Sequence, residues 1–114
     1  MDCIFCKIVS GEIPSEIVYE DEEIIAFNDL APQAPVHVLI VPRMHVASLD
    51  EVNESVLHKD VFGHLLAKIH EIAAQLGLEN GYRLICNNGK DGMQTVEHLH
   101  FHLIGGRQMT WPPG

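Results

Sequence analysis

The 114-residue chain lacks two features that mark whole classes of protein: a surplus of basic residues and a long apolar run. Seven lysines and arginines stand against sixteen acidic residues, so the formal net charge is −9, and the basic residues form no cluster. This composition argues against a broad basic surface for nucleic acid or an anionic membrane. No apolar run approaches the ~20 residues that a membrane-spanning helix needs. We therefore expect neither nucleic acid nor membrane as a partner, whereas one small nucleotide held by backbone amides and neutral polar groups is compatible with the charge.

Cysteine is also scarce in this chain. Three cysteines, an odd number, disfavour a disulfide scaffold and favour a reducing compartment. The chain does not open with a charged segment and a long apolar core, so no secretory signal is predicted and a cytoplasmic protein is expected. Hydrophobic residues make up 46% of the chain and charged residues 20%, which is typical of a globular protein. The length predicts one domain over residues 1–114.

Residue patterns predict an α+β fold built on an antiparallel sheet of about five strands. Short apolar or alternating segments bounded by turn residues predict strands over 16–20, 23–29, 36–41, 81–87 and 98–104. A stripe at helical spacing predicts one long helix over about 55–76, with Val61, Leu65, Ile69, Ile72 and Leu76 on its apolar face. A short N-terminal helical turn should end at Gly11, and Ser48 and Glu51 have the spacing of a capping box for another short helix. The long helix is expected to pack on one face of the sheet.

Three histidines alternate with large apolar residues near the C-terminus, in the run His98-Leu99-His100-Phe101-His102-Leu103. In a strand, alternate side chains point to opposite faces, so the imidazoles would share one face and the apolar side chains would pack on a helix. A row of imidazoles suits metal binding. It equally suits phosphoryl chemistry, in which one ring attacks phosphorus and its neighbours donate hydrogen bonds to the phosphate oxygens. The residues alone leave both interpretations open.

Cysteines and histidines elsewhere give weaker signals. Cys3 and Cys6 have a Cys-x-x-Cys spacing that fits two zinc ligands, a redox pair or two small buried side chains. His58, His64 and His70 lie six residues apart on the predicted long helix, so they do not form one ligand face. We expect these three histidines to be solvated or partly packed, without a function in catalysis.

The segment from Asn87 to Gly92 is rich in residues that tolerate turns, and it leads into the histidine run. It has no pattern of a phosphate-binding P-loop. Its amides, with the side chains of Asn87, Gln94 and Thr95, can nevertheless line an anion pocket beside the histidines.

Motifs in the first third and at the C-terminal end of the sequence resemble the Hint branch of the histidine-triad superfamily, the nucleoside phosphoramidate hydrolases. HLHFHLI fits the histidine-triad pattern, and PQAPVH together with the C-terminal GGRQMTWPPG narrows the resemblance to that branch. The resemblance covers nearly the whole chain. It implies a HIT-like fold that forms a homodimer with a continuous sheet, in which the tail with Trp111 reaches the partner's active site.

The resemblance also assigns roles to individual residues. His100 is similar to the nucleophile, and His102 and His37 are similar to the partners that bind the phosphate and orient the attacking imidazole. His98 corresponds to the first triad histidine, which is more structural or orienting than reactive. The expected nucleotide-binding residues are Asp29 at the ribose, Ile4, Phe5, Ile8, Phe27 and Leu30 around the base, and Asn87, Gln94 and Thr95 around the phosphate.

The implied reaction is hydrolysis of the P–N bond in purine nucleoside 5′-phosphoramidates such as adenosine 5′-phosphoramidate. His100 would attack the α-phosphorus, a protonated neighbour would help the amine leave, and water would release the nucleoside monophosphate from a nucleotidyl-histidine. A backbone carbonyl is expected to hold one ring nitrogen of His100 protonated, which leaves the other nitrogen free. No cofactor is expected for catalysis, because His102 and the loop amides can offset the phosphate charge.

Similarity to some bacterial members of the family implies a zinc site made by Cys3, Cys6, His45 and His98. Two cysteines and two histidines form a closed set of the kind that holds structural zinc. Such a site would pin the N-terminus and take no part in catalysis.

Three positions depart from the commonest pattern of the family: Met93 replaces glycine, Thr95 replaces serine, and Glu97 replaces an aromatic residue. They bear on rate and leaving-group preference and remove no catalytic group. Three rival functions stay open: a dinucleoside polyphosphate hydrolase of the same superfamily, a nucleotide- or partner-binding regulatory protein with incidental hydrolysis, and a metalloenzyme that uses the three histidines as ligands.

Overall fold

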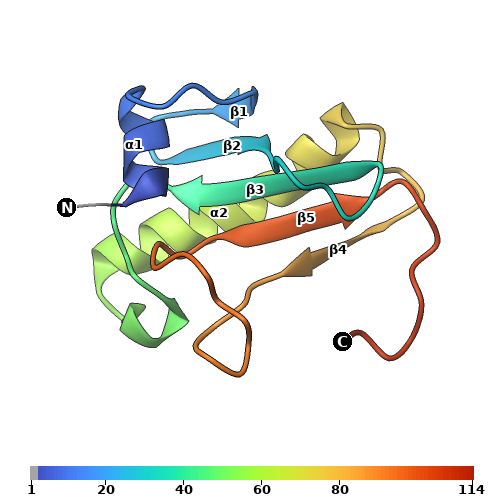
Figure 1. Ribbon diagram of the computed structural model, residues 1–114. Coiled ribbons are helices and arrows are strands. Elements are labelled where there is room, and N and C mark those ends of the chain that lie inside the picture. The colour runs from blue at the N-terminus through green and yellow to red at the C-terminus, as the bar shows by residue number, and fades with distance from the viewer. Residues whose placement is uncertain (1–2) are drawn as a thin grey trace.

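The five strands of this computed structural model form one antiparallel sheet in the order β1-β2-β3-β5-β4, and the structure describes residues 3–114 (Figure 1). In chain order the elements are α1 (Ile4–Ser10), β1 (Ile17–Glu20), β2 (Ile24–Asn28), β3 (Val36–Pro42), the 3₁₀ turn η1 (Leu49–Glu51), α2 (Val56–Gln75), β4 (Tyr82–Ile85) and β5 (Phe101–Gly105). The predicted α+β fold, with one long helix and a short N-terminal helix, is confirmed. The inner strands β3 and β5 are neighbours, so the topology brings His37 and His102 onto adjacent strands.

Helix α2 covers one face of the sheet. Its N-terminus is capped by Ser55, whose hydroxyl accepts a hydrogen bond from the amide of His58 at 3.1 Å. Four members of the predicted apolar stripe, Val61, Leu65, Ile69 and Ile72, are buried, and the last three share a core with β2, β3 and β5. Leu76 lies at the C-cap and is only partly buried. The main hydrophobic core therefore lies between α2 and the sheet.

Helix α1 packs on the opposite face of the sheet. Strand β2 is buried on both sides: Ile24 and Ala26 join the α2 core, and Ile25 and Phe27 join the cluster under α1. A strand covered on both faces is expected to be continuously apolar, and β2 is apolar and buried from Ile24 to Phe27. Helix α1 ends at Gly11, whose φ of 86° lets its amide bond back to the helix.

The histidine strand is shorter than predicted. Strand β5 begins at Phe101, so His98 and His100 precede it. The neighbouring strand β3 ends at Pro42, which has no amide proton with which to extend a ladder. The amide of Leu99 bonds instead to a carbonyl in the turn after β3, at 2.7 Å. Residues 98–100 are therefore held by turn contacts and not by strand pairing.

Two smaller predictions were also wrong. Ser48 and Glu51 enclose only a three-residue 3₁₀ turn, and the Ser48 side chain makes no capping hydrogen bond. Strand β4 covers only part of the predicted segment 81–87, because Gly81 has a φ of 116°, outside the strand region, and the chain turns away after Ile85.

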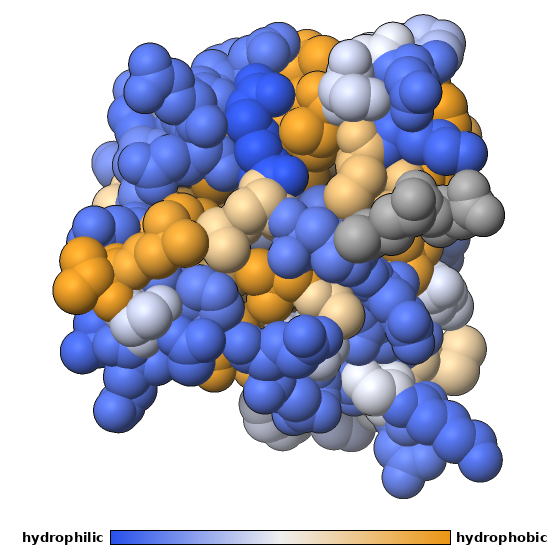
Figure 2. Space-filling view, turned by 90° about the vertical axis from the view of Figure 1, so that its left-hand side faces the viewer, coloured by the Kyte–Doolittle hydropathy of each residue, from blue (hydrophilic) through white to orange (hydrophobic). Residues whose placement is uncertain are grey.

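Figure 2 shows the side of the molecule on which α1 and the first turns of α2 lie. Apolar residues reach this surface in separate patches divided by hydrophilic side chains. Val56 and Leu57, which begin α2, are among the exposed apolar residues. Within residues 3–114, no helix is both long and apolar enough to cross a membrane.

Candidate functional site

Two histidines on neighbouring strands form the centre of the candidate site. The ladder between β3 and β5 pairs Leu39 with His102. Because residues two apart on a strand share a face, His37 lies diagonally opposite His102. Nε2 of His37 and Nδ1 of His102 are 2.8 Å apart. Strand register thus joins two side chains that are 65 positions apart in the sequence.

The backbone sets the direction of this hydrogen bond. The amide of Gln33 donates to Nδ1 of His37 at 3.0 Å, so the neutral His37 ring carries its proton on Nε2. His37 therefore donates to Nδ1 of His102. The neutral His102 ring in turn keeps its own proton on Nε2, where it serves as a hydrogen-bond donor.

The surroundings of His102 keep it neutral. Burial, followed by the neighbouring rings of His100 and His37, lowers the pKa of His102 to about 4. The Asp29 carboxylate acts in the opposite direction, and its Oδ2 lies 3.5 Å from Nε2 of His37. An anionic phosphate bound beside the ring would likewise favour the protonated form.

His100 has the opposite tautomer. Its Nδ1 donates to the main-chain carbonyl of His98 at 2.7 Å, which leaves Nε2 of the neutral ring with a free lone pair. The main-chain carbonyl that we expected to hold one ring nitrogen of His100 protonated is therefore that of His98. The His100 ring is 5% exposed and lies edge to face with Phe5 and His102, at centroid distances of 5.0 and 5.2 Å. This arrangement supplies a nucleophilic nitrogen next to an N–H donor.

A second cluster forms where the N-terminal segment meets the turn after β3. Its four ligand atoms, Sγ of Cys3 and Cys6 and Nδ1 of His45 and His98, all lie within 4.8 Å of one another. Nδ1 of His98 is 3.4 Å from Cys3 Sγ and 3.5 Å from Cys6 Sγ. Nδ1 of His45 is 3.3 Å from both Cys6 Sγ and His98 Nδ1. The structure thus brings the four predicted zinc residues together.

These separations suit a tetrahedral zinc ion. With Zn–S near 2.3 Å and Zn–N near 2.0–2.1 Å, ligand-to-ligand edges are roughly 3.3–3.8 Å. Nε2 of His98 donates to the carbonyl of Pro42 at 2.8 Å, so its Nδ1 lone pair faces the cluster, and such outer hydrogen bonds orient metal-binding histidines. Burial, and then the neighbouring Cys3, raise the pKa of the Cys6 thiol. A cation would offset that unfavourable ionisation, so the donor set fits zinc.

The residues expected around the base are divided between buried and exposed positions. Phe5 and Phe27 are buried and meet edge to face, with centroids 5.5 Å apart. Ile8 is half-buried against the same cluster, whereas Ile4 is 49% exposed. The apolar wall beside His100 is therefore made by Phe5 of α1.

A surface cavity of about 500 Å³ lies next to Asp29. Its lining residues are Pro14, Ser15, Glu16, Asn28, Asp29 and Leu30. Leu30 is fully exposed, and one carboxylate oxygen of Asp29 accepts from the amide of Ala31 at 2.7 Å. Since the other Asp29 oxygen lies near His37, this residue connects the cavity to the histidines.

The loop after β4 is shaped by side chains predicted to surround the phosphate. Nδ2 of Asn87 donates to the carbonyl of Gly92 at 2.5 Å. Gln94 accepts from one loop amide and donates to two carbonyls, one of them in the turn after β3. Thr95 is exposed. Asn87 and Gln94 therefore hold the loop, while Thr95 and the loop amides are the groups open to a ligand.

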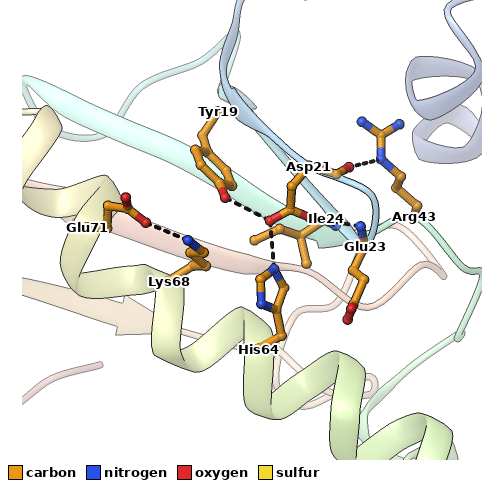
Figure 3. A network of polar contacts seen from close by, with 8 residues as sticks. All are labelled: Tyr19, Asp21, Glu23, Ile24, Arg43, His64, Lys68 and Glu71. Carbon is orange, nitrogen blue, oxygen red and sulfur yellow. Dashed lines mark hydrogen bonds and ion pairs between the residues drawn. The ribbon is translucent and has the colours of Figure 1, made fainter.

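Two residues that the sequence analysis considered, Trp111 and His64, lie away from the histidine triad. Trp111 is 81% exposed on the C-terminal tail, which Arg83 of β4 holds through the carbonyl of Thr110. On the α2 side of the sheet, His64 hydrogen-bonds Asp21 at 2.6 Å and so links the helix to the β1–β2 turn (Figure 3). His64 is partly buried, as expected, and its contacts are structural.

Sequence reasoning could not name the main-chain groups that set the site. The Gln33 amide orients His37, and the carbonyls of Pro42 and His98 orient His98 and His100 respectively. Nearly every residue type supplies the same main-chain amide and carbonyl, so the sequence does not mark the positions at which these groups act. The two prolines that flank Gln33 are the only local hint, because they restrict the loop that carries this amide.

Comparisons with known proteins agree with this geometry. The family model described as HIT domain matches residues 10–109. The 14 kDa zinc-binding protein of Brassica juncea is 48% identical over 113 residues, covering 99% of this chain and 100% of the relative. Adenylylsulfatase HINT1 of Arabidopsis thaliana is 48% identical over 113 residues, covering 97% of this chain and 76% of the relative.

A solved structure is similarly close. The HIT family hydrolase from Legionella pneumophila Philadelphia 1 matches with a TM-score of 0.94 and 48% identity, covering 99% of this chain and 100% of that one. Fold, motifs and relatives therefore agree: this chain belongs to the HIT domain family, in the Hint branch of the histidine-triad superfamily.

Proposed function

We propose that the protein is a nucleotide hydrolase that cleaves the P–N bond of purine nucleoside 5′-phosphoramidates. The observation that carries the proposal is the pair of opposite tautomers in the triad. His100 keeps its proton on Nδ1, against the His98 carbonyl, and frees Nε2 for attack. His102 keeps its proton on Nε2, because its Nδ1 accepts from His37. One ring is thus a nucleophile and the next a donor.

In the first step, Nε2 of His100 attacks the α-phosphorus, so an N–P bond forms to His100 and the P–N bond to the amine breaks. The anionic phosphate favours protonated His102, which gives its proton to the departing amine. While His102 is protonated, His37 can turn its hydrogen bond to Asp29, whose Oδ2 lies 3.5 Å away.

In the second step, water attacks the phosphorus of the nucleotidyl-histidine. The new O–P bond forms as the bond to His100 breaks, and His102 accepts the proton that the water loses. The products are the nucleoside monophosphate and the free enzyme. Dividing one displacement into two is the gain of covalent catalysis.

The nucleotide class is supported by the surroundings of the triad. The cavity beside Asp29 places a carboxylate where ribose hydroxyls could donate to it, and Phe5 offers an apolar wall. The name of the Arabidopsis relative also denotes an adenylyl substrate for that protein. We therefore assign the base, ribose and phosphate contacts to the nucleotide-binding residues expected from the sequence.

Zinc and a second copy of the chain complete the proposal. A zinc ion held by Cys3, Cys6, His45 and His98 would have no open position, so it would pin α1 and leave the chemistry to the histidines. The name of the Brassica relative supports this metal. Strand β4 is an edge of the sheet, so its free side is available for pairing in a homodimer that would bring Trp111 to the partner's site.

Adenylyl sulfate is a second candidate substrate, favoured by the name of the Arabidopsis relative. The same attack by His100 would expel sulfate, which leaves without being protonated. The two substrates therefore differ in their need for the proton on His102.

Turnover of adenosine 5′-phosphoramidate by wild type, His100→Ala and His70→Ala tests the proposal. His70 is an exposed histidine on α2 and serves as the matched control. We expect wild type and His70→Ala to release amine at the same rate and His100→Ala to lose turnover by at least roughly a thousandfold. Intact mass after quenching in neutral denaturant should show the nucleotidyl adduct only where His100 is present.

Equal turnover by His100→Ala and wild type would overturn the assignment of the nucleophile. Faster turnover of adenylyl sulfate than of the phosphoramidate would favour the second candidate. Binding of adenosine monophosphate without hydrolysis of either compound would favour a nucleotide-binding regulatory protein.

A further inference from the structure

We infer that the Cys3–Cys6–His45–His98 cluster is a positioning centre for the His100 nucleophile, so that occupation of the cluster by a metal controls the rate of the chemical step. The inference rests on the proposed function in one respect: it takes His100 to be the attacking residue. Two separate paths connect the cluster to the His100 ring, one through the backbone and one through an aromatic side chain.

The first path runs through the imidazole and the main-chain carbonyl of His98. Its Nδ1 is one of the four ligand atoms, and its Nε2 is tied to the carbonyl of Pro42 at 2.8 Å. Its main-chain carbonyl accepts from Nδ1 of His100 at 2.7 Å. The residue that closes the cluster therefore also holds the nucleophile in its reactive tautomer.

His98 has few other restraints on its backbone. It precedes β5, so no ladder pairing holds it, and the amide of Leu99 supplies the nearest main-chain hydrogen bond. The position of the His98 carbonyl thus depends on the fixed imidazole of the same residue. Its side chain is 0% exposed, which gives that imidazole one defined place.

The second path runs through α1. Phe5 lies between Cys3 and Cys6 in the sequence, and its ring meets those of His100 and His98 at centroid distances of 5.0 and 6.0 Å. Sγ of Cys3 also caps the helix by accepting from the Cys6 amide at 3.3 Å. The two cysteines therefore fix the short helix that carries the wall of the nucleophile.

Helix α1 has only seven residues, too few to be stable on its own in water. Besides the cluster, it is held by the packing of Phe5 and its apolar neighbours on the sheet. When no cation joins the four ligand atoms, the lone pair of His98 Nδ1 faces thiols and another imidazole, contacts that are weaker than coordination. Loss of the metal should therefore loosen α1 and His98 together, while the α2 core remains folded.

The test compares zinc-loaded wild type, chelator-treated wild type, His45→Ala and His70→Ala. His45 is the most exposed of the four ligands and contacts Cys6 and His98, so its truncation removes a ligand without touching the His100 ring. The readouts are zinc per chain, exchange of the His100 Nδ1 proton by NMR (assigned by its loss in His100→Ala), and kcat and KM. Amide exchange along α2 reports whether the core stays folded.

We expect loaded wild type and His70→Ala to bind one zinc per chain and to protect the His100 proton. Chelated wild type and His45→Ala should exchange that proton faster and lose roughly tenfold to a hundredfold in kcat, as is typical for a misplaced catalytic group. KM should change by less than about threefold, since substrate contacts remain. Protection of α2 amides should be equal in all four samples.

Equal exchange of the His100 proton with and without metal would overturn the inference, as would failure of the cluster to bind zinc. Unfolding of α2 on chelation would also overturn it, because the metal would then be a general stabiliser. If His100→Ala retains turnover, the proposed function fails, but the NMR comparison still decides whether the cluster positions the ring.

Discussion

Nε2 of His37 lies 2.8 Å from Nδ1 of His102, and the amide of Gln33 decides which of the two nitrogens donates. The Gln33 amide donates to Nδ1 of His37, so the proton of the neutral His37 ring is on Nε2. The backbone therefore determines which ring nitrogens of His37 and His102 carry protons. The result is a His102 ring that is neutral at neutral pH and offers its Nε2 proton. A main-chain amide outside the triad therefore determines the role of a triad residue.

The variant His37→Ala removes the donor to His102 and should lower kcat for the phosphoramidate by roughly tenfold to a hundredfold. The His102 ring would then be free to exchange tautomers, which ¹⁵N chemical shifts of the ring report directly. His70→Ala serves as the control for a general effect of losing a histidine. An unchanged His102 tautomer together with full turnover in His37→Ala would contradict this account.

The Asp21 carboxylate accepts four hydrogen bonds, and the one from His64 links the β1–β2 turn to α2 (Figure 3). One carboxylate oxygen accepts from the amides of Glu23 and Ile24 at 2.8 and 2.9 Å. The other accepts from the hydroxyl of Tyr19 at 2.8 Å and meets Nε2 of His64 at 2.6 Å. Burial raises the pKa of Asp21, but these hydrogen bonds outweigh it and hold the pKa well below its usual range.

Asp21→Asn should therefore destabilise the protein in a pH-dependent way. Because the pKa of Asp21 is lower in the folded than in the unfolded state, its contribution is complete above the unfolded value of about 3.9 and is lost as the pH falls below it. We expect a loss of about 1–3 kcal/mol in the free energy of unfolding at pH 7 and a smaller loss at pH 3, measured by urea denaturation. The exposed neighbour Glu22→Gln should change stability by less than about 0.5 kcal/mol at either pH. Equal losses for Asp21→Asn at both pH values would show that ionisation of this group is not involved.

Features with a local signal were predictable from the sequence. Short apolar segments bounded by turn residues predicted β2 and β3, and the stripe that includes Leu65, Ile69 and Ile72 predicted α2 and its buried face. These signals are local because side-chain direction in a helix or strand depends on residues only a few positions apart.

Features that depend on distant partners were not predictable. The start of β5 at Phe101 reflects the end of β3 at Pro42, which lies on another strand. Asp21 and His64 are 43 positions apart and neither stands in a motif that points to the other. The zinc set required the family resemblance, because Cys3 and Cys6 alone have a spacing that several structures share.

Met93 is a non-glycine residue with a left-handed φ of 62°, at a position where the family resemblance leads us to expect glycine. Its side chain is 72% exposed, so little burial would be lost on truncation. Met93→Gly should raise the free energy of unfolding by about 0.5–1 kcal/mol, since relief of roughly 1–2 kcal/mol of strain exceeds the entropy that glycine adds to the unfolded chain. Lys90→Gly, in the same turn but without a positive φ, should instead lower it by a similar amount. The two variants would be compared by thermal and urea denaturation. A lower free energy of unfolding for both variants would show that the backbone at Met93 is not strained.

Gly106 follows β5 and lies against Pro35, in the loop that precedes β3 and His37. A Cβ atom added there would lie 2.9 Å from Cβ of Pro35, and the φ of 91° is unfavourable for any L side chain. Gly106→Ala should therefore lower the free energy of unfolding by about 1–2 kcal/mol and reduce turnover, because the displaced Pro35 shifts the loop around His37. Gly63→Ala is the matched comparison, since a Cβ there meets nothing within 4 Å on the exposed side of α2, and it should stabilise the protein by about 0.5–1 kcal/mol without changing turnover. Opposite signs in urea denaturation would confirm that Gly106 is required by its contact and its backbone, and an equally tolerated Gly106→Ala would show that the loop can move without cost.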